Sequence, residues 1–90
     1  MDEEIYEGDL LMARIIDGEK KNLIGKNLKK LRTNLKLSQQ DLSNKLELLG
    51  IYICRGSISR IEDYSRTVTD IELFALAQVL GVDPKDLYQG

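Results

Sequence analysis

Apolar residues recur at helical spacing along most of this 90-residue chain. The longest stripe consists of Ile24, Leu28, Leu31 and Leu35, at positions i, i+4, i+7 and i+11. Residues with this spacing share one side of a helix, so the stripe predicts a helix of about three turns with one buried side. Shorter stripes follow farther along the chain, whereas residues 51–53 are too few to form a sheet alone. The pattern therefore predicts an all-α fold.

Three expected helix starts repeat one capping arrangement. Each has a Ser, Thr or Asp as the N-cap and an acidic residue three positions later, with apolar residues flanking the pair. The cap and its acidic partner are Ser38 and Asp41, Thr69 and Glu72, and Asp83 and Asp86. Asn22 is a suitable N-cap for an earlier helix, and Gly50 and Gly81 are expected helix stops.

These stripes and signals define five expected helices around one core. The helices are expected over residues 23–34, 38–49, 55–64, 70–80 and 84–89. The expected core consists of the apolar residues on their inward sides, which are Ile24, Leu28, Leu31, Leu35, Leu42, Leu46, Ile58, Ile61, Leu73, Leu76, Ala77, Leu80 and Leu87. A chain of this length supplies one such domain and no more.

Residues 1–21 form an acidic N-terminal extension in front of this bundle. Within residues 1–19, seven acidic residues stand against one basic residue. Ile5, Met12 and Ile16 have the spacing of one helix side, but Gly8 weakens such a helix by about 1 kcal/mol. A tail and a short helix therefore both remain open, and a helix would need the bundle or a second subunit to cover its apolar side.

The net charge of −2 conceals a basic middle segment between acidic ends. Residues 20–66 hold eleven Lys and Arg against four Asp and Glu, a net charge of +7, while residues 1–19 carry −6 and residues 67–90 carry −3. A basic surface of this kind is typical of proteins that bind nucleic acids. A solvated lysine face has the same composition, so charge alone does not separate the two interpretations.

The composition argues against an enzyme and against a metal site. The chain has no His and a single Cys, Cys54, so the usual nucleophile–base pairs and zinc sites cannot be built within it. An enzyme that uses acidic residues or Mg²⁺ stays formally open, but no carboxylate cluster stands on a recognisable motif. We therefore expect no catalytic residues, no metal and no cofactor. No apolar run approaches the ~18 residues of a membrane span, and the acidic first residues do not resemble a signal peptide. A single Cys fits the reducing cytoplasm, so we expect a cytoplasmic, nucleoid-associated protein.

The third expected helix carries the candidate binding chemistry. Ile58 and Ile61 are three residues apart and can face the core. Gly56, Ser59 and Arg60 then share the outward side, which has little bulk apart from one guanidinium group. Such a side suits close approach to a flat, acidic ligand.

The order of these motifs resembles the Cro/CI-type helix-turn-helix family, also called the Xre or lambda-repressor-like family. The matching segments are Ile24-Gly25-Lys26-x-Leu28-x-x-Leu31-Arg32, Leu37-Ser38-Gln39-x-x-Leu42, Ser57-Ile58-Ser59-Arg60-Ile61-Glu62 and Leu76-Ala77-x-x-Leu80-Gly81-Val82. Each fragment is weak alone, but their order and spacing over residues 22–88 are specific. The resemblance implies a compact five-helix DNA-binding domain at residues 22–90, which binds an inverted-repeat operator in double-stranded DNA as a homodimer.

The resemblance also assigns roles to individual residues. The base-contacting positions of the family correspond to Arg55, Gly56, Ser59 and Arg60. Its backbone-contacting positions correspond to Gln39, Gln40, Tyr64, Ser65 and Arg66. Arg60 is the best candidate for a guanine contact, because its planar fork matches the O6 and N7 atoms. Arg32 and Glu62 correspond to an ion pair that ties the first helix to the recognition helix in some members.

Three departures from the family pattern affect these assignments. The link before the recognition helix is longer than usual, with an insertion expected at residues 47–51. Cys54 stands where Ser or Thr usually caps this helix, so a late start at Ser57 would place Arg55 in a loop. We expect the Cys54 side chain to be half-buried, like a small apolar residue. Asp63-Tyr64 replaces the usual Gly after the helix, and the Tyr would lie against the DNA backbone or cap the core.

Two functions remain open at this point. The first is a sequence-specific DNA-binding transcriptional regulator of repressor or antitoxin type, which reads the major groove with the helix over residues 55–64. The second is a protein-interaction module that has kept the helical bundle without reading an operator. The acidic extension and the departures from the family pattern favour the second.

Overall fold

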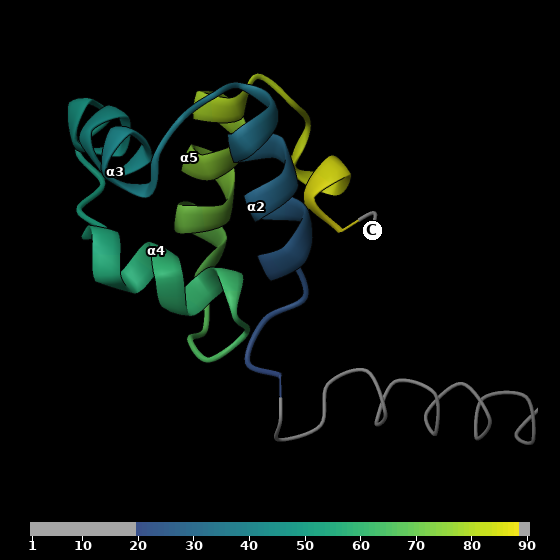
Figure 1. The fold of residues 1–90 in the computed structure, drawn as a ribbon. Coiled ribbons are helices and arrows are strands. Elements are labelled where there is room, and N and C mark those ends of the chain that lie inside the picture. Colours follow the sequence, from purple (N-terminus) through teal and green to yellow (C-terminus); the bar gives the residue numbers. More distant parts are fainter. Residues whose placement is uncertain (1–19, 89–90) are drawn as a thin grey trace, which may run out of the picture.

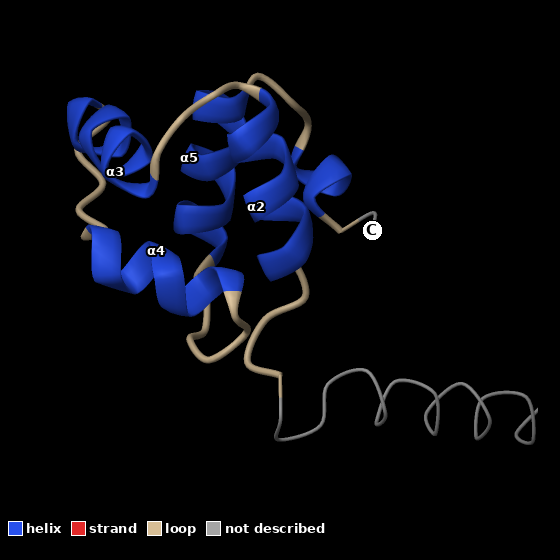
Figure 2. Cartoon of the chain, viewed as in Figure 1, coloured by secondary structure: helices blue, strands red, loops and turns tan. Residues whose placement is uncertain are grey.

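The computed structural model describes residues 20–88, which form a bundle of helices (Figures 1 and 2). The elements are α2 (Gly25–Asn34), α3 (Gln39–Leu48), α4 (Arg55–Glu62), α5 (Asp70–Leu80) and a short 3₁₀ helix, η1 (Pro84–Leu87). α4 packs against α2 and α3, while α5 packs against α3 and η1. The tail or short helix considered for the N-terminal extension lies outside the described residues, and the domain boundary at residue 22 stays a prediction.

The expectation of five helices was wrong for residues 20–88, which contain four α-helices and one 3₁₀ helix. The segment expected to be the last helix spans only Pro84–Leu87. Its predicted capping box is present, formed by Asp83 and Asp86, and Pro84 occupies the first turn. A segment of four residues is too short for α-helical hydrogen bonds to propagate, so it closes as a 3₁₀ turn. Leu87 is nevertheless fully buried and fixes η1 to the core.

The capping boxes predicted for α3 and α5 are present. The Ser38 hydroxyl oxygen accepts a hydrogen bond from the Asp41 backbone N–H at 2.9 Å, and the Asp41 carboxylate accepts one from the Ser38 N–H at 3.0 Å. Thr69 and Glu72 form the same reciprocal pair at the start of α5. These bonds satisfy amide groups that a helix start leaves without partners, which is why the sequence located both starts.

The hydrophobic core follows the predicted stripes with one clear exception. Leu35 was expected in the core but is 50% exposed, because α2 ends at Asn34 and Leu35 already lies in the turn that follows. Leu31 and Leu73 are partly buried and pack against the core. The buried apolar residues are Ile24, Leu28, Leu42, Leu46, Ile53, Ile58, Ile61, Ala75, Leu76, Ala77, Leu80 and Leu87. Ile53 and Ala75 belong to this set although their positions were not predicted.

Candidate nucleic-acid interface

A shallow hollow lies between the start of α3 and the outward side of α4. It is lined by Gln39, Arg55, Gly56, Ser59 and Arg60. No acidic side chain lines it, and the four α4 residues are all exposed. The structure therefore brings the four predicted base-contacting residues together with one of the predicted backbone-contacting residues.

The inward side of α4 anchors this surface to the core. Ile58 and Ile61 are fully buried, and their three-residue spacing turns Gly56, Ser59 and Arg60 away from the bundle. The Arg60 guanidinium donates a hydrogen bond through Nη2 to the hydroxyl of Ser57 on the preceding turn, at 3.2 Å. This bond orients the guanidinium along α4 while the residue remains exposed.

The late start considered for α4 was wrong, because the helix begins at Arg55. Cys54 is its N-cap residue, with extended backbone and no capping bond from the thiol. Cys54 was expected to be half-buried, but it is exposed. Its Sγ atom lies 3.5 Å from the Ser57 hydroxyl oxygen. Hydrogen bonding by Ser57 lowers the pKa of the Cys54 thiol, since it favours the thiolate.

A buried polar network connects α2, α3 and α4. Arg32 is only 7% exposed, and its guanidinium holds both carboxylate oxygens of Glu62, at 2.6 and 3.0 Å. Its Nη1 donates to the Leu37 carbonyl oxygen at 2.7 Å. The Gln39 amide also donates to Glu62, at 3.0 Å. Because the charges are paired and fully bonded, this network fixes the position of α4 against the other two helices.

The start of α2 approaches the end of α4 closely. A Cβ atom on Gly25 would lie 2.4 Å from the Ile61 carbonyl oxygen and 2.8 Å from the Glu62 carbonyl oxygen. Only glycine permits this contact. Asn22 completes the junction: its side-chain NH₂ donates to the carbonyl oxygens of Ile61 and Arg66, while its side-chain oxygen accepts from the Gly25 N–H. The Asn22 side chain therefore caps α2, as predicted. Asn22 is not the N-cap residue itself, however, because it stands two residues before Ile24.

Tyr64 takes the place of the missing glycine after α4. Its φ of 69° lies in the left-handed region, which normally favours glycine. Its hydroxyl oxygen accepts a hydrogen bond from the Lys26 N–H at 3.0 Å, and the Lys20 ammonium lies 4.7 Å from its ring centroid. The left-handed turn therefore forms without a glycine, and the tyrosine side chain bridges the loop to α2.

Two further predicted backbone contacts already have protein partners. The Arg66 guanidinium forms two hydrogen bonds of 3.1 Å with the carboxylate of Glu72. This pairing raises the pKa of Arg66 and lowers the pKa of Glu72. Ser65 donates to the carbonyl oxygen of Arg60 at 3.2 Å. Gln40 is exposed and donates to Asn44 one turn later, at 3.0 Å.

Comparison with known proteins decides what this arrangement is. A family model described as a helix-turn-helix domain matches residues 25–90. The chain belongs to this helix-turn-helix family. The crystal structure of the restriction-modification controller protein C.AhdI from Aeromonas hydrophila is similar to it, with a TM-score of 0.62 and 30% identity over 71% of this chain and 89% of the other. Among curated proteins, no match was found.

In this helix-turn-helix domain, α3 and α4 are the two helices of the motif. A domain of this class is a DNA-binding module, so the resemblance to Cro/CI-type regulators is confirmed at the level of the family. The sequence did not reveal the role of Gly25 or the bridging bonds of Asn22. Their only local signals were a glycine and an N-cap residue at the start of a predicted helix.

Residues 20–88 contain neither a cluster of metal-binding side chains nor a membrane-spanning helix. Within residues 20–88, no group of three or more His, Cys, Asp and Glu stands close enough to hold a metal ion. In the same range, none of the helices combines the length and the apolar character that a membrane span requires.

Proposed function

We propose that this protein is a sequence-specific transcriptional regulator of repressor or antitoxin type, without catalytic activity, that reads operator DNA with α4. The observation that carries the proposal is the acid-free hollow in which Gln39 faces the outward side of α4. A helix with small residues and two arginines on its exposed side can approach base edges closely. The likeness to a restriction-modification controller protein supports a regulatory role.

The contacts divide into base reading and backbone positioning. The proposed base contacts are Arg55, Gly56, Ser59 and Arg60, and the proposed backbone contacts are Gln39, Gln40, Tyr64, Ser65 and Arg66. Gln39 uses one amide N–H for Glu62 and has a second one for a phosphate. The unpaired backbone amides at the start of α3 attract the same anion. Arg66 approaches the backbone with donors that Glu72 does not use.

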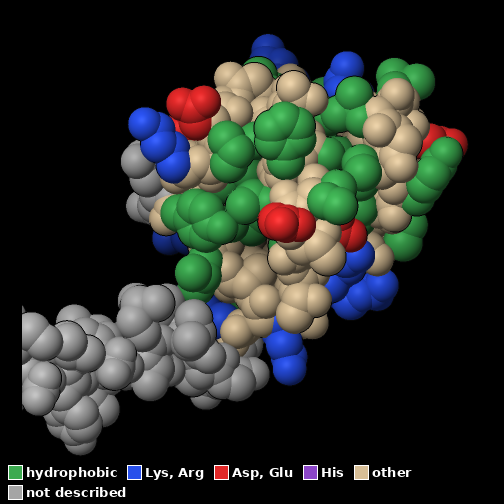
Figure 3. Space-filling view, turned by 180° about the vertical axis from the view of Figure 1, so that it is seen from behind, with side chains coloured by type: hydrophobic (Ala, Val, Ile, Leu, Met, Phe, Trp, Pro, Cys, Tyr) green, Lys and Arg blue, Asp and Glu red, His purple; other side chains and the backbone are tan. Residues whose placement is uncertain are grey.

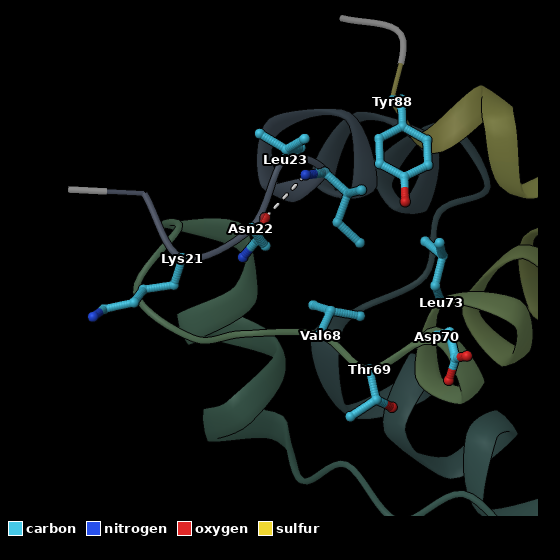
Figure 4. Close-up of a pocket in the computed structure, with 9 residues that line it drawn as sticks. Lys21, Asn22, Leu23, Val68, Thr69, Asp70, Leu73 and Tyr88 are labelled. Atoms are coloured by element: carbon cyan, nitrogen blue, oxygen red, sulfur yellow. Dashed lines mark hydrogen bonds between the residues drawn. The ribbon is translucent and has the colours of Figure 1, made fainter. Parts of the chain in front are cut away.

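An apolar surface supports a homodimer on an inverted-repeat operator. Hydrophobic side chains gather on the face seen from behind in Figure 3. On α5, Ile71 is 65% exposed and Phe74 is 57% exposed. The neighbouring hollow is lined by Leu23, Val68, Leu73 and Tyr88, with Lys21 and Asp70 at opposite ends (Figure 4). In a two-fold dimer the apolar surfaces meet, and Lys21 of one copy can pair with Asp70 of the other.

The same apolar surface would also serve the second candidate function, a protein-interaction module that does not read an operator. Selection of bound sites from a pool of random DNA duplexes separates the two functions. An operator-reading regulator recovers an inverted repeat, and its affinity falls with salt at a slope of about −0.9 for each phosphate contacted. Recovery of no common sequence, with random duplex competing as well as any selected site, would support the interaction module instead.

Substitutions in the hollow test the division of roles. Arg60→Ala should weaken binding to the selected site by about 1–3 kcal/mol and relax the preference at one base pair of each half-site. Gln39→Ala should weaken binding to all sequences alike. Lys85→Ala, on η1 at the far side of α2 from α4 (Figure 1), removes the same charge away from the hollow and serves as the control. If Arg60→Ala and Gln39→Ala changed the preferred sequence equally, the assignment of α4 as the reading helix would be wrong.

A further inference from the structure

A second hollow lies along α3, beside the residue that precedes α4. Gln39, Ser43 and Glu47 stand four residues apart on α3 and therefore share one side of it. Gln39 lines the hollow described above, while Ser43 and Glu47 line a second one together with Tyr52, Ile53 and Cys54. Cys54 lines the second hollow and its chain neighbour Arg55 lines the first, so the two hollows follow one another along α3.

The segment between α3 and α4, residues 49–54, places Tyr52 in the lining of this second hollow. On one side of it, Ile51 donates its backbone N–H to the Leu46 carbonyl oxygen at 3.1 Å. On the other side, the Ile53 side chain is 2% exposed, and its carbonyl oxygen accepts a bond from the Ser43 hydroxyl at 2.7 Å. Tyr52 lies between two anchored residues and is 78% exposed. Residues 51–53 are thus a fixed support for one aromatic side chain, not a loose loop.

From this arrangement we infer that Tyr52 is a further DNA contact, which extends the interface past Arg55 onto the sugar-phosphate backbone. The inference rests on the proposed function, because it requires α4 to lie in the major groove. A neutral phenol suits this rim: its hydroxyl can donate to a phosphate oxygen, and its ring can pack on a deoxyribose. Glu47 lines the same hollow, and its negative charge repels phosphate. We therefore expect Tyr52 to make one close contact with the DNA backbone, without a wider electrostatic attraction around it.

Alanine and phenylalanine substitutions at this position test the contact on the selected operator. Tyr52→Ala should lower affinity about five- to tenfold, and Tyr52→Phe about threefold, since the second variant loses only the hydroxyl donor. Leu49→Ala is the matched control: Leu49 is 49% exposed in the same segment but lines neither hollow. It should leave affinity unchanged. Thermal unfolding checks that all three variants keep the fold.

Hydroxyl-radical footprinting locates the contact. Tyr52→Ala should lose protection of sugars only at the edge of each half-site that faces the start of α4. Glu47→Gln should tighten binding about twofold to threefold at low salt, because it removes a like charge from the same rim. Either an unchanged footprint for Tyr52→Ala or an unchanged affinity for Glu47→Gln would overturn the inference and leave this rim to a protein partner.

Arg60→Ala, measured in the same assay, separates this inference from the proposed function. Loss of binding by Arg60→Ala together with full binding by Tyr52→Ala would reject the extended contact and keep operator reading. If neither variant changed affinity, operator reading by α4 would itself be rejected.

Discussion

At the scale of single residues, α4 uses different positions for packing and for the proposed DNA contacts. Ile58 and Ile61 supply the buried side. On the outward side, an added Cβ at Gly56 would meet only the Arg60 Nη1 atom, at 3.8 Å, which is ordinary contact. The folded chain therefore does not require glycine at position 56, in contrast to position 25, where a Cβ would collide with backbone oxygens of α4.

This contrast predicts opposite effects on stability and binding for one substitution. Gly56→Ala should stabilise the domain by about 0.5–1 kcal/mol, because alanine loses less backbone freedom in a helix than glycine. It should also weaken operator binding several-fold, since the methyl group stands where α4 approaches the bases. Urea unfolding and a binding titration measure the two quantities. Binding as tight as that of the unmodified chain would mean that DNA does not approach α4 at this position.

At the scale of elements, the start of α5 is coupled to the loop after α4. Glu72 accepts from the Thr69 backbone N–H in the capping box and holds the Arg66 guanidinium with both carboxylate oxygens. The hydrogen bonds from Arg66 are the main cause of the lowered pKa of Glu72. One carboxylate thus fixes both the helix start and the loop that leads to it.

The lowered pKa of Glu72 predicts a dependence of stability on pH. A carboxylate with a depressed pKa in the folded state contributes stability above its unfolded value of about 4.3, and the contribution is lost as pH falls through the folded value. Glu72→Gln should cost about 1–2 kcal/mol at pH 7 and have little effect in strong acid. Unfolding free energies measured from pH 7 to pH 2 test this. A constant difference between the two proteins across that range would contradict the role of the charge.

At the scale of the whole molecule, the reading surface and the apolar surface use different elements. The proposed reading surface belongs to α3 and α4, while the apolar surface belongs to α5 and the hollow beside it. Monomeric proteins seldom expose large apolar patches without a partner. This division allows one copy to contact DNA and a second copy at the same time.

The proposed dimer is tested by placing a charge on α5. Phe74→Asp should raise the dimer dissociation constant at least about 100-fold, because each two-fold dimer loses two partly buried rings. Sedimentation velocity measures this change, and binding to the inverted repeat should become less cooperative. Leu35→Asp changes a residue of similar exposure, 50% against 57%, outside this surface and should leave the association unchanged. Equal association of both variants would place the dimer interface elsewhere.

The sequence by itself determined the features that depend on neighbours within a turn or two. The capping boxes at Ser38 and Thr69 and the inward stripe of α4 were read correctly, because their hydrogen bonds and spacings are local. The all-α class followed from the same signals. The predictions were wrong where local signals were weak. Leu35 was assigned to the buried side of α2, but α2 ends one residue before it. The last helix was predicted to be an α-helix, but η1 is a 3₁₀ helix of four residues.

Only the tertiary structure decided how the site is assembled, because its contacts join residues far apart in the chain. Gly25 admits the end of α4, and the Gln39 amide is shared with Glu62 across two helices. Tyr64 holds a left-handed turn, and α2 supplies the Lys26 N–H as a hydrogen-bond partner for its hydroxyl. Such contacts form only after the core has packed, so no local pattern in the sequence specifies them.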